Sequence, residues 1–263
     1  MWEWAENWLQ TEHPDWRVHV TPVTSGFTSI NVAGPRSRKL MRRLVGDVDL
    51  DPEAFEYMQV RTATVAGIRD CFMWRIGFTG ELSFELHVPA GHGLAVWQAL
   101  LDAGEDIGVR PFGVEAQRIM RLEKGHFIVG QDTDGLTKAP AVGLRHLIKL
   151  DKHDFAGKPE LAWALEDTSA SVLVAIQPTH GGRVVPDEAA QIVRPGTDEI
   201  IGRITSSRMS PSLHRPVCLG QVLPEVSTPG SELTVVMLDG RRITARVMEH
   251  HAHFDPDGMR VRG

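Results

Sequence analysis

The stretch Arg75–Leu86 reads RIGFTGELSFEL and decides the fold prediction for the first half of the chain. Gly80 lies in a tight connection, because a residue without a Cβ allows another part of the backbone to come close. In the strand that follows, successive side chains point to opposite faces. Glu85 therefore lies on the opposite face from Phe84 and Leu86. The pattern predicts a carboxylate displayed from a rigid, half-buried strand.

Outward from this stretch, strand patterns alternate with helix patterns up to about residue 160. The expected helices are Trp2–Thr11, Ser37–Leu44, one that begins at residues 51–53, residues 93–103 and residues 114–124. The expected strands are Arg17–Val23, Phe27–Val32, Gln59–Ala66, Arg69–Ile76 and Ser83–Val88. Strands interleaved with helices indicate an α/β or α+β domain.

The pattern changes near residue 165, where a short helical piece at residues 161–169 gives way to strands. These are expected at Val172–Ile176, Ile200–Thr205, Pro216–Val222, Glu232–Leu238 and Arg241–Glu249, with turns at residues 181–182, 239–240 and 255–258. Short strands separated by regular turn signals are typical of a small antiparallel barrel or sandwich. We therefore expect an α+β protein with domains at residues 1–164 and 165–263.

Composition narrows the class of function. The chain has 263 residues, a formal net charge of −6 and two cysteines far apart in sequence. Nucleic-acid-binding proteins usually carry a basic face, and the sequence shows none. Two distant cysteines do not form a disulfide framework. The start is acidic, and no run approaches the roughly twenty apolar residues of a membrane span. A cytoplasmic protein without membrane or nucleic-acid partners is expected.

Common catalytic and metal-binding signatures are absent from the sequence. It has no Walker A loop, no G-x-G-x-x-G and no G-x-S-x-G. Residues 132–135 resemble the opening of a calcium loop but lack its third ligand and closing glutamate. His251 and His253 are expected on one face of a terminal strand, and zinc sites usually draw ligands from separate segments. We predict no metal site.

The position of Glu85 suggests a ligand chemistry. A carboxylate held on a strand can accept two parallel N–H donors, such as those on the amino-pyrimidine edge of a pterin. Phe78 could offer a flat apolar wall to the same ring. Periodicity alone favours the alternative, in which Glu85 is a solvated strand residue and Phe78 belongs to the core.

A second informative stretch, Arg121–Gly135, reads RLEKGHFIVGQDTDG. It continues a helix on which Arg118 and Arg121 are three residues apart. Arg121 and Glu123 lie just before the helix ends at Gly125. The two side chains could bind an anionic substrate tail or pair with each other, and the pattern alone favours the pair.

These two stretches resemble the aminomethyltransferase (glycine cleavage T-protein) superfamily, in particular the C-terminal half of sarcosine oxidase alpha subunits and of dimethylglycine oxidase. The likeness covers nearly the whole chain. It also includes residues 8–12, 33–36, 155–158, 202–207, 210–213 and 254–258.

The resemblance implies a fold around a channel that binds tetrahydrofolate, followed by a β-barrel. It implies transfer of a one-carbon unit to tetrahydrofolate, giving 5,10-methylenetetrahydrofolate, with amine-oxidising flavoprotein subunits as partners. The family's folate-binding positions correspond to Glu85 and Phe78, and its channel-bordering arginine to Arg121. Thr79 and Glu81 are expected around them.

The sequence also departs from the family. Members of the family begin roughly a hundred residues before the start of this chain. That length fits the missing portion of an α/β domain of usual size. That portion holds an aspartate beside the folate, so no catalytic residue is assigned. The flavin- and nicotinamide-binding portions of sarcosine oxidase are also absent, so the chain alone is not expected to oxidise an amine. One alternative is a folate-dependent iron–sulfur-cluster maturation protein, but the cysteine of that family's motif is His126 here. Another is a folded but inactive fragment.

Overall fold

The computed structural model describes residues 1–179 and 183–263, which form two compact units. Unit 1 comprises Met1–Gly77, Glu81–Pro111 and Arg260–Gly263, and unit 2 comprises Phe78–Gly80 and Phe112–Met259. The turn expected at residues 181–182 lies outside the described residues. The boundary expected near residue 165 marks a change in the pattern of elements and stays a prediction about domains.

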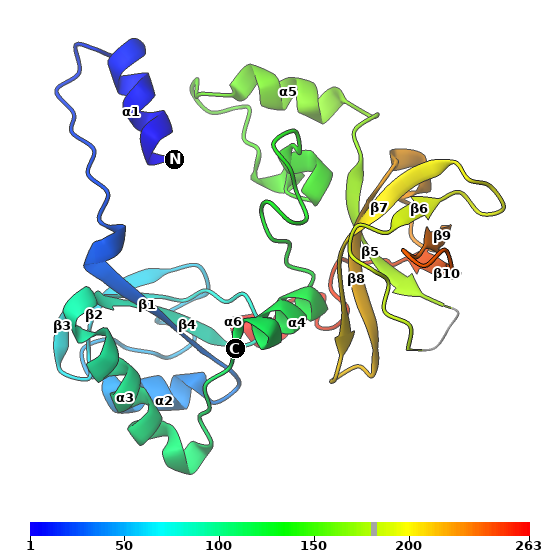
Figure 1. The fold of residues 1–263 in the computed structure, drawn as a ribbon. Coiled ribbons are helices and arrows are strands. Elements are labelled where there is room, and N and C mark those ends of the chain that lie inside the picture. The colour runs from blue at the N-terminus through cyan, green and yellow to red at the C-terminus, as the bar shows by residue number, and fades with distance from the viewer. Residues whose placement is uncertain (180–182) are drawn as a thin grey trace. The chain divides into compact units, whose positions relative to one another are not determined.

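Unit 1 is built on a four-stranded antiparallel sheet (Figure 1). Its strands, in the spatial order β1-β4-β3-β2, are β1 (Phe27–Ala33), β4 (Ser83–Pro89), β3 (Ile68–Trp74) and β2 (Val60–Val65). All four follow the strand patterns of the sequence. In the register of the sheet, Glu85 lies opposite Asn31 on β1 and opposite Trp74 on β3.

Two helices, α2 (Ser37–Leu44) and α3 (Gly93–Gly104), pack on one face of this sheet (Figure 1). Phe84, Leu86 and Val88 of β4 are each 0% exposed in the core between the sheet and the helices. The alternation expected along this strand is therefore confirmed. Glu85 and His87 lie between these core positions and are only partly buried.

Two elements expected in unit 1 are wrong. Residues 17–23 form no strand, because the segment has no ladder partner among the described residues and its valines remain exposed. Residues 51–55 form a single turn instead of a helix, in which the amides of Ala54 and Phe55 donate to the carbonyl of Asp51. Helix α1 (Trp2–Thr11) forms as expected but buries none of its residues.

The first helix of unit 2 is α4 (Val114–Lys124), and its strands form a closed barrel. The barrel strands follow each other in the order β10-β5-β8-β7-β6-β9. They are β5 (Val172–Pro178), β6 (Gln191–Val193), β7 (Ile200–Ser210), β8 (Arg215–Val222), β9 (Glu232–Val236) and β10 (Arg242–Val247). The predicted barrel is confirmed. The sequence missed β6, whose three residues are too few for a periodic pattern.

The remaining elements are short. They are α5 (Lys158–Glu166), α6 (Met259–Arg262) and the 3₁₀ turns η1 (Thr24–Gly26), η2 (Ala90–His92), η3 (Glu105–Ile107), η4 (Ala139–Val142), η5 (Arg145–Leu147) and η6 (Pro224–Val226). Within the described part of the chain, no helix is long and apolar enough to cross a membrane.

The last residues of the chain return to unit 1. The buried guanidinium of Arg75 donates to the carbonyls of Val261 and Arg262, at 2.8 Å each. Burial lowers the pKa of Arg75 to about 10. The carbonyls therefore serve as acceptors for a cation that lies 0% exposed inside the unit.

Candidate functional site

Glu85 projects from the middle of β4 on the sheet face opposite the core. Its side chain is 33% exposed, and its Oε1 lies 2.9 Å from Nε2 of His87. The two side chains share a face because they are two residues apart on a strand. Among the described residues, no hydrogen bond engages the second carboxylate oxygen of Glu85, which can accept N–H donors from a ligand.

His87 holds the Glu85 carboxylate in place. Its other ring nitrogen, Nδ1, lies 3.0 Å from the hydroxyl of Ser29 on β1. When Nε2–H donates to the Glu85 carboxylate, the Nδ1 of a neutral ring accepts from the Ser29 hydroxyl. The histidine therefore bridges two strands and restricts the rotamer of Glu85.

Aromatic rings surround this pair on the same face. The Trp74 ring lies 5.7 Å from the His87 ring, and the Phe72 ring lies 5.6 Å from that of Phe27. Phe72 and Trp74 are 40% and 41% exposed. A partly exposed carboxylate next to exposed aromatic rings suits a flat ligand that carries N–H donors on one edge.

Glu81 lies in unit 1 but is engaged elsewhere. Its Oε1 accepts from Nη1 of Arg260 at 2.8 Å, and its side chain is 24% exposed. The contact ties residue 81 to the returning end of the chain. Glu81 therefore has a structural contact of its own.

The bend at residues 78–80 belongs to unit 2. Gly80 has φ +81°, and a Cβ there would lie 2.9 Å from Cβ of Lys124, so the close approach expected at this glycine is confirmed. Thr79 is 3% exposed, and its hydroxyl has no hydrogen-bond partner among the described residues. A buried hydroxyl without a partner costs free energy, which a ligand acceptor or a water would recover.

Phe78 is half-buried and lies against His126. The two rings are stacked, with centroids 5.6 Å apart and planes at 16°. Nδ1 of His126 also lies 2.9 Å from the carbonyl oxygen of Phe78. Burial lowers the pKa of His126, which favours its neutral form near pH 7.

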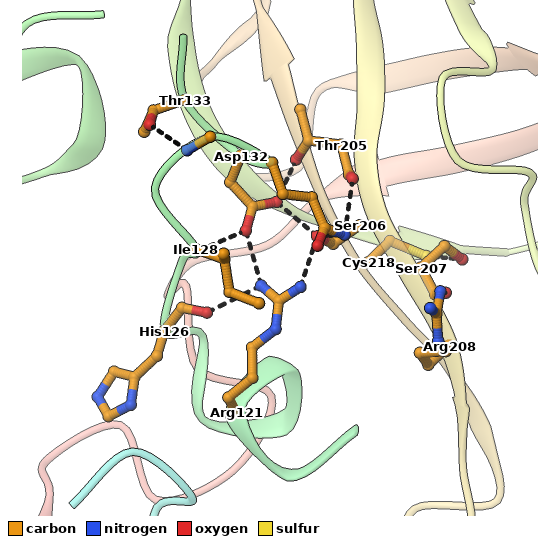
Figure 2. Close-up of polar contacts among 12 residues, drawn as sticks. Arg121, His126, Ile128, Asp132, Thr133, Thr205, Ser206, Ser207, Arg208 and Cys218 are labelled. Atoms are coloured by element: carbon orange, nitrogen blue, oxygen red, sulfur yellow. Dashed lines mark hydrogen bonds and ion pairs between the residues drawn. The ribbon is translucent and has the colours of Figure 1, made fainter. Parts of the chain in front are cut away.

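Arg121 forms the centre of a buried polar cluster (Figure 2). The side chain is 2% exposed, and its Nη1 donates to Oδ2 of Asp132 at 2.7 Å. Nη1 also donates to the carbonyl of His126 at 3.0 Å, and Nη2 donates to Oγ of Ser206 on β7 at 2.7 Å. The Nε of Arg121 has no partner among the described residues.

Asp132 receives hydrogen bonds at both oxygens. The hydroxyls of Thr205 and Ser206 donate to Oδ1, each at 2.6 Å, and the amide of Ile128 donates to Oδ2 at 2.8 Å (Figure 2). These bonds join α4, the loop after it and β7. We call Arg121, Asp132, Thr205 and Ser206 the buried clamp.

The clamp changes the interpretation of three residues. The sequence pattern favoured a pair between Arg121 and Glu123, but the guanidinium pairs with Asp132, and Glu123 accepts from Ser210 at 2.5 Å. Asp132, which the sequence pattern placed first in an incomplete calcium loop, instead accepts hydrogen bonds from the other residues of the buried clamp. Among the described residues, no group of three or more His, Cys, Asp or Glu side chains could hold a metal ion.

The histidines near the end of the chain were placed wrongly by the sequence. They follow β10 in an irregular segment instead of sharing a strand face. His251 contacts the carbonyl of Leu173, and His253 contacts that of Cys218. Each ring therefore contacts a backbone carbonyl of a barrel strand, in β5 and β8 respectively.

The predicted site residues fall into two groups. Glu85 and Glu81 lie in unit 1, and Phe78, Thr79 and Arg121 lie in unit 2. Sequence reasoning missed His87 and His126, which contact Glu85 and Phe78. His87 shares a strand face with Glu85, so the same alternation could have found it. His126 lies 48 residues from Phe78, and no local pattern links them.

Comparison with known families agrees with this architecture. Residues 1–152 match the GCVT N-terminal domain, and residues 172–253 match the glycine cleavage T-protein C-terminal barrel domain. The chain belongs to the glycine cleavage T-protein family.

Individual relatives bear two different names. The chain is 33% identical to a sarcosine oxidase subunit alpha of Corynebacterium sp. (strain U-96), over 99% of this chain and 27% of that protein. It is also 33% identical to an aminomethyltransferase of Halothermothrix orenii, over 92% of this chain and 65% of that protein. The chain thus spans less than two thirds of either relative.

A solved structure shares the fold. The glycine cleavage system aminomethyltransferase T of Bartonella henselae superposes with a TM-score of 0.71, at 24% identity, over 82% of this chain and 56% of that one. At this identity the likeness supports the fold alone.

Proposed function

We propose that this chain binds tetrahydrofolate and serves as the one-carbon-transfer part of a sarcosine-oxidase-like enzyme that forms 5,10-methylenetetrahydrofolate. Membership in the glycine cleavage T-protein family supports folate-dependent one-carbon transfer in general. The similarity to sarcosine oxidase alpha subunits supports the more specific role and a partnership with amine-oxidising flavoprotein subunits.

The observation that carries the proposal is the carboxylate of Glu85. It is presented on a sheet face, oriented by His87 and left with an oxygen that accepts further donors. The amino-pyrimidine edge of a pterin offers two parallel N–H groups, and charge-assisted bonds of this kind are short and oriented. Phe78 offers its ring as a wall for the pterin.

The residues present fit the cofactor. Acceptors are needed for the pterin N–H groups, and Glu85 supplies them, since His87 is its one ion-pair neighbour among the described residues. Thr79 adds a buried hydroxyl that lacks a partner among the described residues. When bound, tetrahydrofolate supplies the ring nitrogens that take up the one-carbon unit.

The protein's own part in this proposal is binding and orientation. Glu85 fixes the edge of the pterin through its carboxylate. Arg121, which is 2% exposed and bonded on both terminal nitrogens, holds the surrounding chain. Pre-organised contacts of this kind lower the entropic cost of holding a reactive group in place.

Calorimetric titration with a stable reduced folate, such as 5-formyltetrahydrofolate, tests the role of Glu85. Glu85→Gln removes the charge while keeping the shape, and we expect a loss of about 1.5–3 kcal/mol, or roughly ten- to a hundred-fold in Kd. Glu232→Gln is the matched control, because Glu232 also carries an exposed strand carboxylate paired with one basic side chain.

The control should bind as tightly as the unmodified chain. Equal affinity of Glu85→Gln and the unmodified chain would assign the pterin contact to another residue. Absence of folate binding by all three folded proteins would favour an inactive fragment.

A further inference from the structure

A continuous series of contacts leads from the buried clamp to the ring of Phe78. Arg121 is fixed by Asp132 and Ser206, and it donates to the backbone carbonyl of His126 (Figure 2). The imidazole of the same histidine then contacts Phe78 through both its Nδ1 atom and its ring face. All of these residues belong to unit 2.

His126 is held at two points. Its carbonyl accepts from Arg121 at 3.0 Å, which fixes its backbone just after the helix end at Gly125. Its Nδ1–H donates to the Phe78 carbonyl at 2.9 Å, because a carbonyl oxygen can only accept. The ring orientation of His126 therefore follows from the position of both chain segments.

The stacking of the two rings restricts the orientation of the Phe78 ring. The rings are nearly parallel at 16°, with centroids 5.6 Å apart, a favourable offset arrangement for two aromatic side chains. Phe78 is half-buried, so one part of its surface is covered and another is open. Without a neighbour, the ring of a half-buried phenylalanine can occupy more than one rotamer.

We propose that His126 is a positioning residue that fixes the Phe78 ring for stacking on bound folate, and that the buried clamp acts on the ligand only through this histidine. The inference rests on the proposed function insofar as it concerns the ligand. It gives a role to Arg121, whose side chain is 2% exposed and donates through both terminal nitrogens to groups of the protein.

A ligand-free experiment tests the positioning directly. The chain contains nine phenylalanines, so labelling with 4-fluorophenylalanine gives nine fluorine signals, and Phe78→Leu identifies that of Phe78. Removing the stacked ring in His126→Leu should shift or broaden the Phe78 signal and leave signals distant from it in place. His126→Gln, which keeps a donor but loses the ring, provides a second variant should the leucine variant fail to fold.

His251→Leu is the matched control. His251 is also a half-buried histidine of unit 2 with a single backbone carbonyl contact, at 2.9 Å to Leu173. Its replacement should leave the Phe78 signal unchanged. An unaltered Phe78 signal in both His126 variants would overturn the inference, whatever the protein binds.

The affinity for folate then tests whether the fixed orientation of the Phe78 ring contributes to ligand binding. We expect His126→Leu to weaken 5-formyltetrahydrofolate binding about two- to tenfold, the range of one aromatic contact. In a Phe78→Leu background the same change should have no further effect, because the residue acts through Phe78. Independent, multiplying losses would contradict the inference.

The two failures can be told apart. If the unmodified chain does not bind the folate, the proposed function fails, and the fluorine signals still decide whether His126 positions Phe78. If folate binds and Glu85→Gln weakens the binding, but the Phe78 fluorine signal is unchanged in the His126 variants, the proposed function stands and this inference fails.

Discussion

The imidazole of His253 is held between a donor and an acceptor. Nη1 of Arg215 lies 3.1 Å from its Nδ1, and the carbonyl of Cys218 lies 3.3 Å from its Nε2. Because the arginine can only donate, Nδ1 must carry a lone pair and Nε2 the proton. Burial, with the nearby Arg215 charge, lowers the pKa of His253 to about 4.

This lowered pKa predicts that acid destabilises unit 2, to which His253 belongs. Below a pH of about 6.5 the unfolded chain binds a proton at this histidine and the folded chain does not, so stability falls as the pH falls towards 4. The loss is on the order of 3 kcal/mol between pH 7 and pH 4. Urea unfolding at several pH values measures it, with His253→Gln expected to flatten the dependence.

The exposed His250 supplies the control for this experiment. His250→Gln should leave the dependence on pH as it is in the unmodified chain. A His253→Gln protein that loses the same stability on acidification would assign the effect to other groups.

Residue patterns predicted the candidate site in part. Alternation on one strand was enough to place Glu85 away from the core, since the faces of a strand are fixed by geometry. The partner of Arg121 was predicted wrongly, because Asp132 reaches it only after the loop following α4 has folded back. Thr205 and Ser206, some eighty residues further along, complete the clamp through tertiary structure alone.

At the scale of elements, the end of α4 depends on Gly125. This residue has φ +79°, and its amide donates back to the carbonyls of Arg121 and Leu122. A Cβ there would lie 2.4 Å from the backbone carbonyl of His251. The helix end and the segment after β10 therefore meet at a position that has room only for glycine.

Gly125→Ala should accordingly lower the free energy of unfolding by roughly 2–5 kcal/mol, the sum of left-handed strain and overpacking. Gly130→Ala is the control, because Gly130 has φ +89° but no heavy atom within 4 Å of a Cβ. That control should lose only about 1–2 kcal/mol. Urea unfolding measures both values, and equal losses would mean that the segment around His251 moves aside at little cost.

Elements with long periodic patterns were predicted well, and short or unpaired ones were not. The barrel strands carry enough alternation to be recognised, apart from the three residues of β6. Residues 17–23 have the alternation of a strand but pair with no other strand in the part of the chain that the structure describes. Pairing is a tertiary property. The sequence cannot reveal whether a suitable neighbour exists.

At the scale of the whole molecule, the chain has a separate core in each unit. One surrounds the sheet of unit 1 and includes Leu86, and another fills the barrel and includes Val235. Each core has its own set of buried side chains, so each unit can unfold as a unit of its own.

We therefore expect two thermal transitions in scanning calorimetry. Leu86→Ala removes a fully buried side chain and should destabilise one transition by about 2–5 kcal/mol while the other keeps its midpoint. A corresponding Val235→Ala variant should shift the other transition. A single transition that both variants lower equally would contradict the division.

The most direct test of the central claim is a calorimetric comparison of two ligands with the unmodified, folded chain. We predict that 5-formyltetrahydrofolate binds and that p-aminobenzoylglutamate, which lacks the pterin, does not bind at the same concentrations. This result would locate recognition at the pterin edge, where Glu85 is proposed to act. Binding of neither ligand, or equal binding of both, would contradict the account.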